Sequence, residues 1–160
     1  MATFDISSEL KKQEVINAVD QCHREISNRY DFRDTNTSVN LMETSILLKS
    51  STLDRLLAAE QVLKEKFVKR NVSIKFLGDI KDETLPSEVK RTFNLKSGID
   101  QSTSKEIITL LKKSNKKIQC SYQNETIRVT SKKRDDLQEA ISLIKDSDIE
   151  KPLNFGNFRD

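Results

Sequence analysis

The residues best suited to chemistry in this 160-residue chain are basic ones gathered in one segment. Residues 105–134 hold only two glutamates against the following lysines and arginines: Lys105, Lys112, Lys113, Lys116, Lys117, Arg128, Lys132, Lys133 and Arg134. Such a cluster attracts phosphates and other anions. A structural interpretation competes with this one, because lysines at the end of a helix complement the helix dipole and aid solubility. The anion-binding interpretation is favoured by Lys132, Lys133 and Arg134. They stand at the start of an expected helix, where the helix dipole disfavours positive charge.

Residue types that support catalysis are sparse. The single histidine, His23, follows Cys22, and the second cysteine, Cys120, is remote, so the usual metal-ligand spacings are absent. Neighbouring residues on a helix point about 100° apart, and Cys22 falls on an apolar face, which disfavours a thiol–imidazole pair. The three glycines form no phosphate-binding loop, and no hydrolase or kinase motif is present. We therefore expect a protein without enzymatic activity, metal or cofactor.

Composition limits the class of protein. The net charge is only +3, from 28 basic and 25 acidic residues, so overall charge does not indicate a nucleic-acid-binding protein. Apolar residues make up 35% of the chain, which suits two thin domains better than one deep core. The beginning of the chain has no apolar signal region, and no stretch resembles a membrane span. With its two isolated cysteines, the chain is expected in the reducing cytoplasm, without membrane partners.

The apolar pattern of the first half predicts strands and helices in the order βαββαβ. The expected elements are a strand at 3–6, a helix at 12–29, strands at 37–41 and 45–50, a helix at 52–70 and a strand at 72–77. Residues 78–91, which contain Gly78, Pro86 and many charged side chains, are interpreted as a linker.

The second half repeats this order. The expected elements are a strand at 92–95, a helix opened by a capping box at 103–106, a hairpin of strands 117–123 and 126–131, a helix through 137–144 and an extended segment at 153–158. Ser50, Asp54, Leu56, Ala59 and Leu63 recur at identical spacing as Ser131, Asp135, Leu137, Ala140 and Ile144. Each serine is expected to cap a helix, although any βα unit tends toward such a pattern. The matching order of elements favours a duplication, with repeats at 1–85 and 86–160.

One strand of the second repeat points toward a ligand. In residues 126–131, Ile127 and Val129 face inward, so Arg128 and Thr130 face the other side of the sheet. A sheet face with Arg128 can receive a phosphate. RNA-binding modules of ferredoxin-like shape also place aromatic side chains on this face, and here there are none. Any nucleic-acid contact is therefore expected to be weak or non-specific in sequence.

Several segments together resemble the YajQ family. They are "FDI" near the start, "RYDFRD" at 29–34, "FNLKSGID" at 93–100, "IRVTSKKRDDLQ" at 127–138 and "NFRD" at 157–160. The resemblance runs from Phe4 to Asp160. It implies an α+β fold of two ferredoxin-like domains from a tandem duplication, with the N-terminal strands, 3–6 and 92–95, exchanged between the sheets.

The resemblance also implies a function. Members of the family are described as nucleotide-binding proteins: some bind RNA or tRNA, and some respond to cyclic di-GMP and act on transcription through a partner regulator. The expected ligands are therefore RNA or a nucleotide such as cyclic di-GMP, ATP or GTP, bound without catalysis. This chain has Asp34 where the family often has the glycine of "DFRG", and an acid there is expected to lower phosphate affinity.

These considerations give a set of candidate nucleotide-binding residues, with a stacking role for the aromatic ring and phosphate contacts for the cations. They are Phe32, Arg33, Lys96, Arg128, Lys132, Lys133, Arg134 and Arg159. Two alternatives stay open. Arg33 and Arg159 can instead pair with the neighbouring Asp34 and Asp160, and the protein can be an adaptor in transcription regulation with only incidental nucleotide binding.

Overall fold

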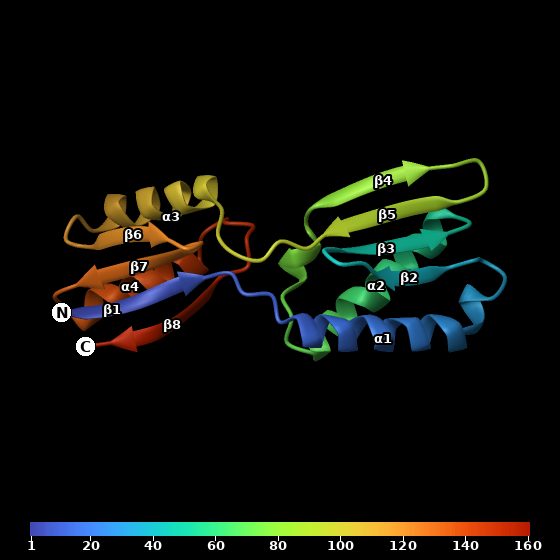
Figure 1. The fold of residues 1–160 in the computed structure, drawn as a ribbon, viewed down its shortest axis with the longest axis horizontal. Helices are drawn as coiled ribbons and strands as arrows, with labels where there is room; N and C mark the ends of the chain where they lie inside the picture. The colour runs from blue at the N-terminus through green and yellow to red at the C-terminus, as the bar shows by residue number, and fades with distance from the viewer. The chain divides into compact units, whose positions relative to one another are not determined.

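The chain forms two compact units, each built from one antiparallel sheet and two long helices (Figure 1). The computed structural model describes all residues from Met1 to Asp160. Unit 1 consists of Met1–Glu9 and Ser97–Asp160, and unit 2 consists of Leu10–Lys96. The predicted α+β fold of two ferredoxin-like units is confirmed.

Unit 2 carries its sheet in the strand order β2-β3-β5-β4, with all neighbours antiparallel. Its elements are α1 (Lys12–Asn28), η1 (Tyr30–Phe32), β2 (Ser38–Leu41), β3 (Ser45–Ser50), α2 (Leu53–Lys69), η2 (Ile74–Leu77), β4 (Ile80–Thr84) and β5 (Val89–Asn94). The two long helices are amphipathic, and their apolar faces meet the inward side chains of β3 and β5, such as Ile46 and Phe93, in one core.

Unit 1 has the strand order β6-β7-β1-β8, again antiparallel throughout. Its elements are β1 (Ala2–Ser7), α3 (Gln101–Ser114), β6 (Gln119–Gln123), β7 (Thr126–Ser131), α4 (Arg134–Lys145) and β8 (Asn154–Arg159). Phe4 of β1 and Ile127 of β7 are fully buried beneath the two helices. In Figure 1, α4 lies behind β7 and β1.

Unit 1 includes a strand that is distant in sequence from the rest of the unit, whereas unit 2 is one continuous segment. β1 lies between β7 and β8 in unit 1, and β5 lies between β3 and β4 in unit 2. The compact units therefore divide the chain after Glu9 and after Lys96. The assignment of sequence repeats to 1–85 and 86–160, with strands exchanged during their history, stays a prediction about ancestry.

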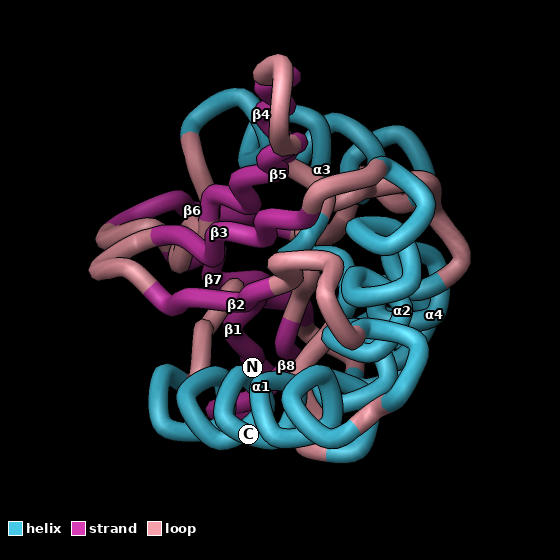
Figure 2. The backbone as a smooth tube through the Cα atoms, turned by 90° about the vertical axis from the view of Figure 1, so that its right-hand side faces the viewer, coloured by secondary structure: helices cyan, strands magenta, loops and turns pink.

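The expectation for residues 72–91 was wrong in two places. The strand predicted at 72–77 is the short 3-10 helix η2, in which the adjacent Phe76 and Leu77 are both buried. A regular strand cannot do this, because its successive side chains point to opposite faces. The predicted linker contains β4, a strand whose side chains are all exposed and which pairs only with β5, at the edge of the sheet (Figure 2).

The predicted helix caps were also misplaced. The helix α3 begins before the proposed capping box, with Asp100 at its N-cap and the Ser102 hydroxyl donating a 2.8 Å hydrogen bond to the Asp100 carboxylate. Hydrogen bonds from Thr103 and Ser102 lower the pKa of Asp100 to about 2.

Ser50 and Ser131 are buried last residues of β3 and β7 rather than caps. The N-caps of α2 and α4 are Thr52 and Lys133. None of the helices combines the length and apolar character that crossing a membrane requires.

Candidate functional site

The sheet of unit 1 leaves one face free of helices. Phe4, Ile127 and Val129 point toward the helices and are buried, so the alternate residues of the same strands form the open face. Two rows of this face follow from the strand register: Gln119, Thr130, Thr3 and Arg159 in one, and Ser121, Arg128, Asp5 and Gly156 in the next. The face is polar and carries two guanidinium groups, on β7 and β8.

Arg128 is held by an acid on this face. Its Nε lies 3.2 Å from the Asp5 carboxylate, which also accepts a 2.7 Å hydrogen bond from the Asn157 amide. Burial alone would raise the pKa of Asp5, but the hydrogen bonds from Asn157 and Arg128 outweigh it and lower that pKa. Arg128 is therefore already paired, which weakens it as a site for a phosphate.

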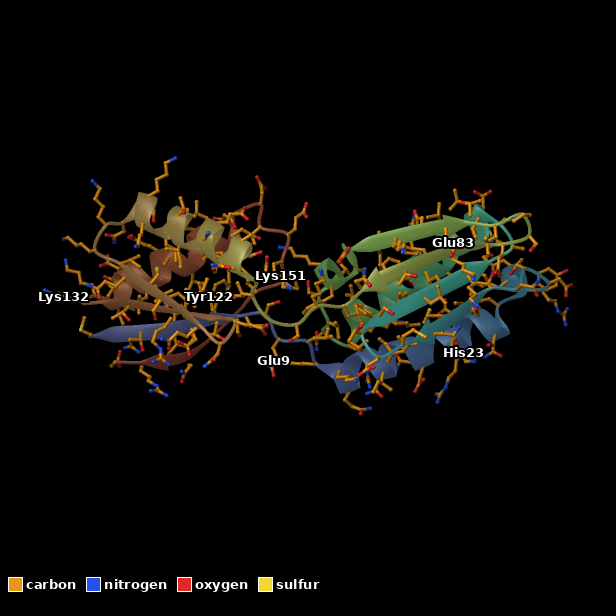
Figure 3. The ribbon with its side chains drawn as sticks, turned by 45° about the horizontal axis from the view of Figure 1, so that its top comes forward. Glu9, His23, Glu83, Tyr122, Lys132 and Lys151 are labelled. Atoms are coloured by element: carbon orange, nitrogen blue, oxygen red, sulfur yellow. The ribbon has the colours of Figure 1, made fainter.

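Cations gather where the sheet of unit 1 ends at the chain termini. We call these residues the basic end: Lys112, Lys113, Lys116, Lys117, Lys132, Lys133, Arg134 and Arg159. The pairing of Ala2 with Ser131, Thr3 with Arg159, and Thr130 with Gln119 brings their segments to the same end of the four strands. Figure 1 shows both termini at this end, and Figure 3 shows Lys132 extending from it.

The six lysines of the basic end are exposed and have no acidic partner. In unit 2, by contrast, many cations are neutralised: Arg91 lies 2.7 Å from Asp82 and 2.8 Å from Glu60. Unit 1 contains as many acidic as basic residues, so the basic end reflects an uneven distribution of charge and not a net charge. An unneutralised cluster of this kind attracts anions over distances of several ångströms.

Lys133 occupies a position that helix energetics disfavour. It is the N-cap of α4, makes no side-chain cap hydrogen bond and places a positive charge at the positive end of the helix dipole. We expect Lys133→Ser to raise the free energy of unfolding by about 1 kcal/mol, since serine caps a helix and lysine does not. Urea unfolding measures this change. A loss of stability in the variant would show that Lys133 has a structural role, which would remove it from the candidate site.

A pocket of about 320 Å³ adjoins the basic end. We call it the terminal pocket; its lining residues are Ala2, Thr3, Arg134, Leu137, Gln138, Phe158, Arg159 and Asp160. Phe158 stacks on the buried Phe4, with ring centroids 5.8 Å apart and ring planes 24° apart, yet its side chain is 56% exposed. The Arg134 guanidinium lies 3.2 Å from the Asp160 carboxylate. Phe158 and Arg134 thus line one cavity.

The first Phe-Arg-Asp sequence, at 32–34, lies in unit 2 in a different setting. Phe32 is only 5% exposed, and the Arg29 guanidinium lies 5.0 Å from the centre of its ring. The ring therefore has no free face for a base, contrary to the proposed stacking role. Arg33 is exposed and lies 5.8 Å from the ring of Tyr30, beside a cavity of about 500 Å³.

The candidate residues are thus divided between the two units. Arg128, Lys132, Lys133, Arg134 and Arg159 belong to unit 1, and the last four lie together at the basic end. Phe32, Arg33 and Lys96 belong to unit 2, where Lys96 lies 3.5 Å from Asp79.

The neighbour pairs considered as alternatives for the two arginines do not form. Neither Arg33 with Asp34 nor Arg159 with Asp160 makes an ion pair, and Asp160 contacts Arg134 instead. Sequence reasoning missed Phe158 and Gln138 as binding candidates. The only sequence signal for Phe158 was its place beside Arg159 in the terminal "NFRD".

The cysteine beside the histidine is not arranged for catalysis. Cys22 is fully buried in the core of unit 2, where its thiol faces the Ala59 carbonyl oxygen at 4.0 Å, whereas His23 extends from the outside of α1 (Figure 3). Burial, with a smaller contribution from Glu25, raises the pKa of the Cys22 thiol to about 12. We expect Cys22 to react with an aromatic disulfide reagent at pH 8 at least roughly 100-fold more slowly in the folded than in the unfolded protein. Rapid labelling of native Cys120→Ser protein would contradict this expectation.

The chain is similar to proteins that are named for nucleotide binding. A family model described as "Nucleotide-binding protein YajQ-like" matches residues 2–159. The chain is 41% identical to a protein named nucleotide-binding protein from Hahella chejuensis (strain KCTC 2396), and the match covers the whole of both chains. Proteins of the same name from Coxiella burnetii (strain Dugway 5J108-111) and Legionella pneumophila (strain Corby) are 42% and 41% identical, again over both full lengths.

Proposed function

Because the chain belongs to the YajQ-like family of nucleotide-binding proteins, we propose that it binds single-stranded RNA, without catalysis, through the basic end of unit 1. The contacts are made to phosphate groups by Lys132, Lys133 and Arg159, with the lysines at the end of α3 and in the following loop beside them. Arg128, which is already paired with Asp5, lies beside this surface on the open face of the sheet.

The observation that supports this proposal most strongly is the absence of acidic partners for the six lysines of the basic end. Each lysine is therefore open to contact with an external anion. The helix dipole accounts for Lys112 and Lys113, in the last turn of α3, but opposes Lys133, the N-cap of α4. A lysine at the N-cap of α4, where the helix dipole disfavours it, is explained if its side chain contacts a phosphate.

An extended ligand suits this arrangement better than a small one. The cations come from four separate segments: the end of α3, the loop before β6, the junction of β7 and α4, and the end of β8. A cyclic dinucleotide has two phosphates and can engage few of these groups, whereas an RNA strand presents a phosphate at every nucleotide. The open face of the unit 1 sheet has no aromatic side chain, so we expect little discrimination between base sequences.

Salt dependence tests the proposal. A fluorescent single-stranded RNA is titrated with the protein between 50 and 300 mM salt, and log K is plotted against log salt concentration. Each phosphate contact contributes about −0.7 to the slope, so four to six contacts predict a slope of roughly −3 to −4. A slope near zero would contradict the proposal. Calorimetric titrations with cyclic di-GMP, ATP, GTP and a tRNA pool show in parallel which of these ligands binds.

A second candidate function rests on a different surface. Tyr30 is 81% exposed, lies beside Arg33 and borders a cavity of about 500 Å³ in unit 2. Tyrosine and arginine are the residues that most often dominate protein–protein interfaces. An adaptor that docks a transcription regulator on this surface requires Tyr30 but not the lysines of the basic end. Loss of a regulatory phenotype in Tyr30→Ala, combined with unchanged RNA binding, would favour the adaptor.

A further inference from the structure

We propose that the terminal pocket binds one nucleoside monophosphate unit, with its base stacked on Phe158 and its phosphate on Arg134 at the start of α4. This inference rests on the proposed function, since it assigns a nucleotide to a position beside the RNA-binding surface. It adds a specific pocket to a surface that otherwise attracts phosphates without selecting among them.

The ring of Phe158 is held in place on one face and exposed on the other, as stacking of a base requires. One face of its ring lies against the buried ring of Phe4, at a centroid distance of 5.8 Å and an interplanar angle of 24°. The side chain is nevertheless 56% exposed, so the opposite face is free for a base to continue the stack. Because Phe4 already fixes the ring, binding a base costs little side-chain entropy. Base stacking on an aromatic side chain tolerates any base but strengthens with the size of the base.

Arg134 lies where a phosphate attached to such a base can reach it, because it lines the same pocket as Phe158. Arg134 is the first residue of α4, so its backbone adds the positive end of a helix dipole to its guanidinium group. Arg159 follows Phe158 directly but belongs to the open face of the sheet, where its charge helps to lower the pKa of Asp5. The Asp160 carboxylate now pairs with Arg134 at 3.2 Å, and both side chains are largely exposed, so a phosphate can displace it.

The remaining walls of the pocket select for one nucleotide. Leu137 supplies an apolar surface, and the exposed Gln138 offers an amide donor and acceptor that match the hydrogen-bonding edge of adenine. A volume of about 320 Å³ is at the lower end of the range for small-molecule sites, so the pocket holds a single nucleotide. We therefore expect purine monophosphates to bind more tightly than pyrimidine monophosphates, with AMP the tightest.

The nucleoside monophosphate can be free in solution or can be the first unit of a 5′-phosphorylated RNA strand. In the second case, the strand would continue over Lys132 and Lys133, which directly precede Arg134. The two sources share one chemistry and differ in whether affinity rises with strand length.

The experiment uses the full-length protein and monitors AMP, GMP, CMP and UMP by calorimetry and by NMR shifts. Phe158→Ala is expected to weaken AMP binding roughly 10-fold, and Phe158→Leu, which keeps the contact with Phe4 but removes the stacking face, roughly 5-fold. Asp160→Asn is expected to strengthen AMP binding severalfold by releasing Arg134. Tyr30→Ala is the matched control, because Tyr30 is an exposed ring beside an arginine in unit 2.

The result that would overturn the proposal is AMP affinity that is absent, or equal in the wild type and both Phe158 variants. Comparison of RNA oligonucleotides with a 5′-phosphate or a 5′-hydroxyl separates the two sources: a preference for the phosphate assigns the pocket to a strand end, and equal binding assigns it to free nucleotides.

Different results would contradict the pocket proposal and the RNA-binding proposal. Loss of the pocket leaves the salt dependence of RNA binding intact, whereas a flat salt dependence with normal AMP binding removes only the RNA surface.

Discussion

Replacing Phe4 by alanine is expected to destabilise unit 1 by about 3–5 kcal/mol while leaving unit 2 folded. Phe4 is fully buried beneath the helices of unit 1, where it contacts the rings of Phe155 and Phe158. Its strand, β1, lies between β7 and β8, so loosening β1 also exposes the hydrogen-bonding edges of both neighbours. The residue is remote in sequence from most of the unit that it stabilises.

Hydrogen exchange measured residue by residue tests this expectation. In Phe4→Ala, protection is expected to fall in β7, β8 and α4 and to persist in β3 and α2. Phe93→Ala is the matched control, because Phe93 is equally buried in β5 and belongs to the core of unit 2. Its loss is expected to reduce protection in β3 and α2 instead. Equal loss of protection in both units by either variant would contradict the division into two cores.

The second large effect concerns RNA affinity. The double variant Lys132→Ser with Lys133→Ser is expected to weaken binding of single-stranded RNA about 25-fold at 0.1 M salt. It removes two phosphate contacts, each of which contributes about 0.7 to the slope of log K against log salt concentration. The slope is therefore expected to become shallower by about 1.4. Serine at position 133 also improves the N-cap of α4, so weaker binding cannot be ascribed to unfolding.

Unit 2 supplies a closely matched control for this variant. Lys11 is the N-cap of α1, Lys12 is its first residue, and both are exposed. Lys11→Ser with Lys12→Ser removes the same charge, likewise around a helix N-cap, and is expected to change RNA affinity less than twofold. Similar losses in the two double variants would mean that binding follows total charge and not the basic end.

The local elements were largely predictable, but the partners of each strand were not. The hairpin of β6 and β7 follows from alternating apolar residues around a turn, and Asn124 and Glu125 there adopt positive φ angles. Nothing in the composition of residues 2–7 shows that β1 pairs with β7 and β8. That expectation came from family resemblance alone, because strand pairing over more than 100 residues leaves no local pattern.

Both errors in strand prediction, the missed β4 and the strand wrongly predicted at 72–77, arise because periodicity depends on which side chains are buried. Sequence periodicity detects a strand by its buried alternate residues, and β4 has none, since all of its side chains are exposed. Residues 74–77 are apolar enough to suggest a strand, but their two adjacent buried side chains require a tight helical turn.

The aromatic residue of the terminal pocket was hidden by a backbone irregularity. Phe155 and Phe158 are three positions apart, so a regular strand would point them to opposite faces. The register of β8 against β1 shifts between Thr3 and Asp5, and Asn157 adopts a φ of 54°. This bulge turns both rings toward Phe4. The candidate cations were visible in the sequence, but only the sheet register brings Arg159 beside Lys132 and Arg134.

Mapping the RNA contact by NMR tests the central proposal most directly. Isotope-labelled full-length protein is titrated with a short single-stranded RNA, and the shifts of backbone amides are assigned to residues. We predict that the largest changes fall at Lys117, at 131–134 and at Arg159, with the helices of unit 2 unaffected. Changes confined to unit 2, above all around Tyr30 and Arg33, would contradict RNA binding at the basic end.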